Sequence, residues 1–115
     1  MVNNRAARLD RVFSALGDPT RRAILERLAR GQATVTEVAK PLPISLPAVS
    51  KHLRILEQAG LIARQKQGRV HHLSLSPAAM KDAAEWLERY RQFWGDQLDN
   101  LAGYLESQPE RRGRR

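Results

Sequence analysis

The sequence predicts a mostly helical domain that carries one small β-hairpin. Three observations support this fold class: apolar residues recur at helical spacing in the first 60 residues, alternating strand-like segments flank Gln67-Gly68, and a second helical pattern covers residues 77–106. The 115 residues suit one domain of ordinary size. We therefore expect a single domain over residues 1–106 and a disordered basic tail over residues 107–115.

Two helices are expected before residue 31. Asp18 followed by Pro19 is a helix start signal, because the aspartate side chain accepts a backbone hydrogen bond and proline has no N–H to leave unpaired. A helix should therefore begin there and end at Gly31. The helix before it should span about residues 5–16, where apolar side chains recur at helical spacing at Leu9, Val12, Phe13 and Leu16.

Two further helices are expected before residue 60. A short one should begin near Thr36 and stop before Pro41, because proline cannot continue a helix. Ser45 can cap the next one, which should continue up to Gly60. Its buried face is marked by Val49, Leu53 and Leu56.

A β-hairpin and a long last helix should follow. Residues 61–66 and 69–75 flank the turn dipeptide Gln67-Gly68, which is typical of a hairpin. The last helix should cover residues 77–106, where Gly95 and Gly103 could introduce a kink or a break.

Helix, helix, helix and hairpin in this order form a winged helix-turn-helix, in which a recognition helix enters the major groove of DNA and the wing follows the phosphate backbone. The outer face of the helix capped by Ser45 fits this role, because small side chains permit close approach and cations reach bases or phosphates. The residues assigned to DNA contact are Ser45, Leu46, Pro47, Ser50, Lys51 and Arg54 on this helix, with Arg64, Lys66 and Arg69 around the tip of the wing.

The charge of the chain favours the same partner. Lys and Arg number 20 against 12 Asp and Glu, which gives a net charge of +8. Residues 1–76 hold 13 basic and 5 acidic side chains, whereas residues 77–106 hold 3 and 6. Any single cation could lie on an ordinary solvated face, but the combination predicts double-stranded DNA as the partner.

Several classes of protein are excluded by what the sequence lacks. It has no cysteine, so disulfides, thiolate metal sites and cysteine nucleophiles are excluded. It has neither histidines clustered with carboxylates nor a glycine-rich phosphate loop, so we expect no enzyme and no cofactor. Apolar runs do not exceed three residues, so we expect a cytoplasmic protein without a membrane partner.

The last helix carries more apolar side chains than one face needs, and five of the six aromatic residues lie in it. One stripe is expected to dock on the domain, while another packs with the first helix against a second subunit. The alternative is a monomer that buries both stripes. A two-fold dimer would require a roughly palindromic operator. The residues assigned to the dimer interface are Leu9, Val12, Phe13, Trp86, Tyr90, Phe93, Trp94, Leu98 and Leu101.

None of the three histidines is a strong candidate for a functional site, although His72 could approach the DNA backbone. His52 should pack or hydrogen-bond at the edge of the core. His71 and His72 are adjacent in a strand, so they lie on opposite faces and make a poor chelate.

Four stretches of the sequence form a specific combined motif: Ala15–Leu25, Pro47–Leu56, Ala59–Ile62 and Gly68-Arg69. With this motif, the sequence over about residues 9–106 resembles the ArsR/SmtB family of repressors. This resemblance implies a dimeric winged-helix regulator that binds an operator in its own or a neighbouring promoter and usually leaves when an effector binds.

The sequence departs from the metal-sensing members of that family. Where they carry Cys-Val-Cys before an acidic residue, this chain has Thr34-Val35-Thr36-Glu37, and hydroxyls do not hold soft metals. The family's second type of site needs histidine in the last helix, and residues 77–106 contain none. We therefore expect the non-metal branch, with an unidentified effector if any. A winged-helix module for protein or RNA contacts is the alternative function.

Overall fold

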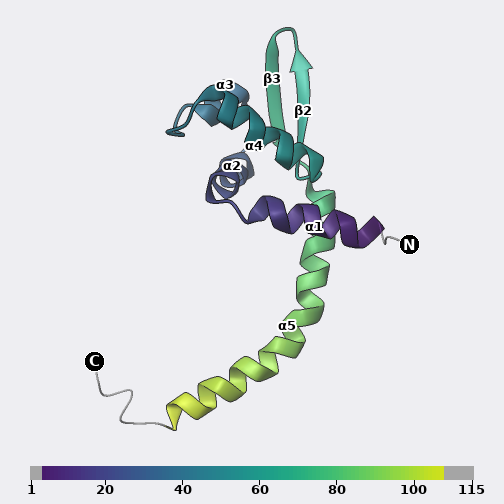
Figure 1. The fold of residues 1–115 in the computed structure, drawn as a ribbon, viewed down its shortest axis with the longest axis vertical. Coiled ribbons are helices and arrows are strands. Elements are labelled where there is room, and N and C mark those ends of the chain that lie inside the picture. Colours follow the sequence, from purple (N-terminus) through teal and green to yellow (C-terminus); the bar gives the residue numbers. More distant parts are fainter. Residues whose placement is uncertain (1–3, 108–115) are drawn as a thin grey trace. The chain divides into compact units, whose positions relative to one another are not determined.

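The computed structural model describes residues 4–107, which form two compact units that divide between Ala83 and Ala84. The predicted basic tail lies outside the described residues, apart from Ser107. Figure 1 shows the helices and strands along the chain. The helices are α1 (Asn4–Leu16), α2 (Pro19–Ala29), α3 (Val35–Ala39), α4 (Leu46–Gln58) and α5 (Pro77–Glu106), and the strands are β1 (Ala33–Thr34), β2 (Ile62–Gln67) and β3 (Val70–Leu75).

The helix starts follow from local capping. Asp18 caps α2 by accepting a hydrogen bond of 3.0 Å from the backbone N–H of Arg21, and Pro19 is the first helical residue. Ser45 caps α4 in the same manner. Both starts confirm the prediction. The helix α3 begins at Val35, one residue earlier than expected, because Thr34 forms a reciprocal capping box with Glu37.

The strands form one antiparallel sheet in the order β1-β3-β2. The predicted hairpin is confirmed, and its turn contains Gly68, whose φ of 64° costs glycine little. The loop end of the hairpin projects beyond α3 and α4 (Figure 1). The strand β1 was not expected. It consists of two residues, paired to Leu73 and His72 of β3, and it completes a mostly helical winged helix-turn-helix fold.

The core of the first unit lies where α4 packs against α1, α2 and β2. The predicted apolar face of α4 is fully buried, with Val49, Leu53 and Leu56 at its centre. Every other helix of this unit and the sheet contribute buried side chains: Ala15, Ile24, Leu28, Val38, Ile62, Leu73 and Ala83. Close packing of these side chains fixes α4 in the domain.

Two residues of α1 differ from their expected role. Leu9 and Val12 are only 8% and 1% exposed, so they belong to the core and not to a surface that could contact a second copy. The reason is that helical spacing of apolar residues marks a buried face without indicating what buries it. Phe13 is half-buried.

The helix α5 runs without a break through Gly95 and Gly103, so the break that these glycines could introduce is absent. A glycine inside a helix lowers the stability of the helix by only about 1 kcal/mol relative to alanine, and the surrounding residues offset this loss. Residues 84–107 include no buried side chain, because one helix has no second element to pack against. Its large apolar side chains are between 42% and 60% exposed: Leu87, Tyr90, Phe93, Trp94, Leu98, Leu101, Tyr104 and Leu105.

Ring contacts add some local order to this unit. The ring centroids of Trp86 and Tyr90 lie 4.4 Å apart, and those of Phe93 and Trp94 lie 5.4 Å apart, edge to face. None of the helices within residues 4–107 combines the length and the apolar character that crossing a membrane would need.

Candidate nucleic-acid interface

The recognition helix of this fold is α4, and its outer side holds the residues predicted to contact DNA. Its buried face points into the core, so the remaining positions are left to solvent. Ser50 is half-buried, and the other five predicted residues are exposed: Ser45, Leu46, Pro47, Lys51 and Arg54.

The tip of the hairpin adds two more exposed cations. Lys66 pairs with His71 near the end of β2, and Arg69 follows Gly68 in the turn. Among residues 4–107, Lys51, Arg54, Lys66 and Arg69 form no ion pair, so no described acidic side chain neutralises these four charges. The helix and the hairpin therefore present an unneutralised basic surface.

Arg64 does not lie at the tip, although the sequence suggested it. Its Nε and Nη2 atoms donate hydrogen bonds of 2.9 and 3.0 Å to the two carboxylate oxygens of Glu57, near the end of α4. It pairs across the sheet with the buried Leu73, so it lies on the face of the hairpin that continues into the core. Its side chain is 29% exposed. Arg64 thus joins the base of the wing to α4, and Glu57 neutralises its charge.

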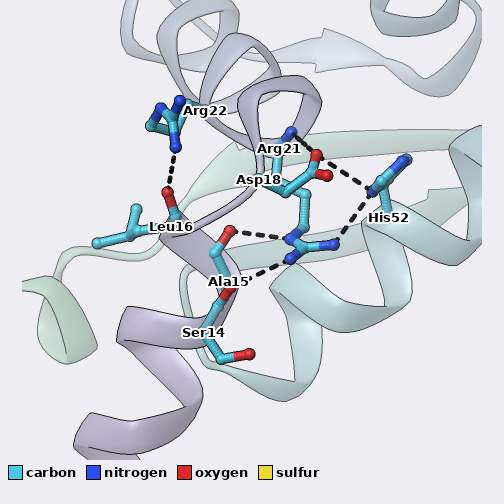
Figure 2. Close-up of polar contacts among 7 residues, drawn as sticks. All are labelled: Ser14, Ala15, Leu16, Asp18, Arg21, Arg22 and His52. Carbon is cyan, nitrogen blue, oxygen red and sulfur yellow. Dashed lines mark hydrogen bonds and ion pairs between the residues drawn. The ribbon is translucent and has the colours of Figure 1, made fainter.

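Arg21 is a structural residue that the sequence analysis missed. Its side chain reaches back to the C-terminal end of α1, where the last carbonyl groups of a helix lack partners (Figure 2). The Nε atom donates to the carbonyl oxygen of Ala15 at 2.8 Å, and Nη2 donates to that of Ser14 at 3.1 Å. The neighbouring Arg22 donates to the carbonyl oxygen of Leu16 at 2.7 Å. Adjacent arginines just after a helix-helix turn were the signal that could have indicated this role.

The same side chain also contacts the recognition helix. Nη1 of Arg21 lies 3.3 Å from Nδ1 of His52, and Oδ2 of Asp18 lies 3.8 Å from that nitrogen (Figure 2). Because a guanidinium can only donate, Nδ1 of His52 is the acceptor in its contact with Arg21. The expected hydrogen-bonding role of His52 at the edge of the core is confirmed.

Two carboxylates of this region are held in the charged form. The backbone N–H of Arg21 and then its guanidinium charge hold the pKa of Asp18 below its ordinary value. The backbone N–H and the hydroxyl of Thr34 lower the pKa of Glu37 likewise.

The segment that replaces the family's cysteine motif is used for capping. Glu37 N donates to the Thr34 hydroxyl at 3.1 Å, and Thr34 N donates to a carboxylate oxygen of Glu37 at 2.8 Å. Nowhere between residues 4 and 107 do three His, Asp or Glu side chains gather closely enough to hold a metal ion.

Comparison with known proteins relates the chain to a family. Residues 16–65 match the model of a helix-turn-helix domain. The chain is 40% identical over 99 residues to the HTH-type transcriptional regulator Rv2034 of Mycobacterium tuberculosis, which covers 86% of this chain and 90% of that protein. It is 38% identical over 79 residues to the transcriptional repressor SdpR of Bacillus subtilis, covering 69% of this chain and 88% of SdpR.

Solved structures agree with these relatives. The crystal structure of an ArsR family transcriptional regulator matches with a TM-score of 0.74 and 42% identity, over 78% of this chain and 93% of that one. The chain belongs to the ArsR family. An ArsR-like transcriptional regulator from Rhodococcus sp. RHA1 also matches, with a TM-score of 0.70 and 33% identity over 89% of this chain and 96% of its own. The resemblance inferred from the sequence is therefore confirmed, and the family is one of DNA-binding transcriptional regulators.

Proposed function

We propose that this ArsR family member is a homodimeric repressor that binds a roughly palindromic operator through α4 and the hairpin. The observation that carries this proposal is the division of α4 into two faces. Val49, Leu53 and Leu56 are fully buried, while Lys51 and Arg54 are exposed and unpaired within residues 4–107. Such a helix can enter a major groove without losing its packing on the domain.

The basic residues divide into two roles. Ser50, Lys51 and Arg54 face the bases, and Arg54 has the fork geometry that reads guanine. Lys66 and Arg69 at the end of the hairpin neutralise phosphates without reading sequence. Arg64 has no direct role in this proposal, because its charge is already paired with Glu57.

Dimerisation is assigned to α5 and to the half-buried Phe13 of α1. The support is the row of apolar side chains on α5 that no other element buries within residues 84–107. Apolar surface of this extent is typical of a protein interface. The assigned residues are Phe13, Trp86, Tyr90, Phe93, Trp94, Leu98 and Leu101.

The repressor role rests on the relatives, since SdpR is a repressor and aligns with this chain over most of its own length. Release by soft metals is not part of the proposal, because Thr34 and Glu37 bind each other in a helix cap. Zinc or arsenite at one equivalent should leave an operator complex intact.

The test is a binding titration with the duplex upstream of the gene and a scrambled duplex of equal length as competitor. We expect the upstream duplex to be preferred at moderate salt, and Arg54→Ala to abolish the preference. Lys81→Ala is the control, because it removes one exposed positive charge from α5. Equal binding of both duplexes by the unaltered protein would contradict the proposal and favour a general interaction module.

A further inference from the structure

The first residue of the recognition helix has an unusual environment. Leu46 is 59% exposed, more than any other large apolar side chain among the described residues of the first unit. It lies on the surface assigned to DNA, where polar and cationic side chains are expected. A leucine there gains little from the core of the domain and is available for contact with a partner.

The start of α4 has few free hydrogen-bond donors. Pro47 has no backbone N–H. The N–H of Ala48 donates to the Ser45 hydroxyl at 3.2 Å, and the N–H of Val49 donates to the Ser45 carbonyl oxygen at 3.0 Å. A helix N-terminus often binds phosphate through such groups, but the N–H groups of Ala48 and Val49 are already used here. Leu46 and Pro47 therefore offer an apolar surface in place of a phosphate site.

The surroundings of this apolar surface indicate a nucleic-acid occupant. Ser50 and Arg54 follow Leu46 by one and two helical turns on the same flank, and Lys51 lies beside them. These cations complement a polyanion and would disfavour the burial of the helix start by an apolar protein surface. In the major groove only one base carries an apolar group at its edge, and that group is the C5 methyl of thymine.

We propose that Leu46 is a specificity-determining residue that recognises a thymine methyl group in each half-site, with Pro47 extending the contact. This inference rests on the proposed function, because it assumes that α4 enters the major groove. The inference names thymine as a base that the protein selects by apolar contact and not by hydrogen bonding. Leu46 contributes by packing, so its effect depends on a single methyl group and not on charge.

The experiment begins with selection of preferred duplexes from a random library by the full chain. Each thymine of the selected site is then replaced by deoxyuridine, which keeps the base pair and removes only the methyl group. We expect one thymine per half-site at which this replacement weakens binding by about three- to fivefold, the value of one buried methyl-sized group. Leu46→Ala should bind the thymine and uracil duplexes equally.

Lys51→Ala is the matched control, since it weakens binding to both duplexes and keeps the thymine preference. Thermal unfolding of Leu46→Ala should match the unaltered protein, because the side chain is exposed. A Leu46→Ala protein that still discriminates thymine from uracil would overturn the inference, as would a selected site with no sensitive thymine. Selection that yields no preferred sequence would instead contradict the proposed function itself.

Discussion

Nη1 of Arg21 lies 3.3 Å from Nδ1 of His52, so one side chain joins the start of α2 to the recognition helix. The same guanidinium holds two carbonyl oxygens at the end of α1. Three helices therefore meet at one residue that is only partly buried. The position of α4 relative to α1 depends on this contact as well as on the apolar core.

Arg21→Lys should destabilise the domain, because a lysine cannot reach three acceptors from one fixed plane. We expect the free energy of unfolding to fall by about 1–2 kcal/mol, as measured by urea denaturation. Arg22→Lys is the control, since its single hydrogen bond to Leu16 can be made by an ammonium group. Equal losses for both variants would show that the bridge to His52 and the two α1 carbonyls adds nothing.

The lowered pKa of Asp18 predicts that the free energy of unfolding depends on pH in the acid range. Its pKa is lowered in the folded chain, chiefly by the backbone N–H of Arg21, so the folded state binds this proton less readily than the unfolded state. The stabilisation is present above the ordinary pKa of the carboxyl group and is lost as the pH falls through the lowered value. Asp18→Asn keeps a cap acceptor without the charge, so its urea midpoint should fall less between pH 5 and pH 2. An unchanged acid dependence in this variant would refute the assignment.

The two wing arginines should behave differently in DNA binding. Arg69→Ala should weaken binding to all sequences and lower the salt slope by about one, because a phosphate contact is lost. Arg64→Ala should leave the salt slope unchanged, since Glu57 already neutralises that charge. Fluorescence anisotropy at several salt concentrations separates the two. A lower slope for Arg64→Ala would mean that the pair opens on DNA.

Charged substitutions on α5 should produce monomers. Leu98→Glu introduces a charge into the apolar row assigned to the dimer, and burying it would be costly. Sedimentation velocity should therefore show loss of the dimer. Gln92→Glu adds the same charge on the polar side of the helix and should leave association intact. Persistence of the dimer in Leu98→Glu would place the interface elsewhere.

Local signals account for what could be predicted of the fold. Asp18-Pro19 and Ser45 mark helix starts through hydrogen bonds to residues three positions later. Because both partners are close together in the sequence, these starts could be predicted from the sequence alone. The glycine turn of the hairpin is similarly local. The strand β1 has only two residues and exists because β3 pairs with it, so no periodicity could reveal it.

The features that sequence reasoning missed depend on distant partners. Arg21 and His52 are 31 residues apart, and their contact requires the packed domain. Arg64 was assigned to the DNA surface because its charge is visible in the sequence, whereas its pairing with Glu57 is not. Leu9 and Val12 show a related ambiguity. The apolar pattern of a helix face is the same whether that face packs on its own domain or on a second copy of the protein.

The absence of buried side chains in residues 84–107 links folding to protein concentration. An isolated helix is marginal in water, so this stretch gains most of its stability when its apolar row is covered. If a second copy covers it, helix content and melting temperature rise with concentration by mass action. Dilution would then unfold this segment before it unfolds the DNA-binding unit, and the protein would lose its second half-site contact at low abundance.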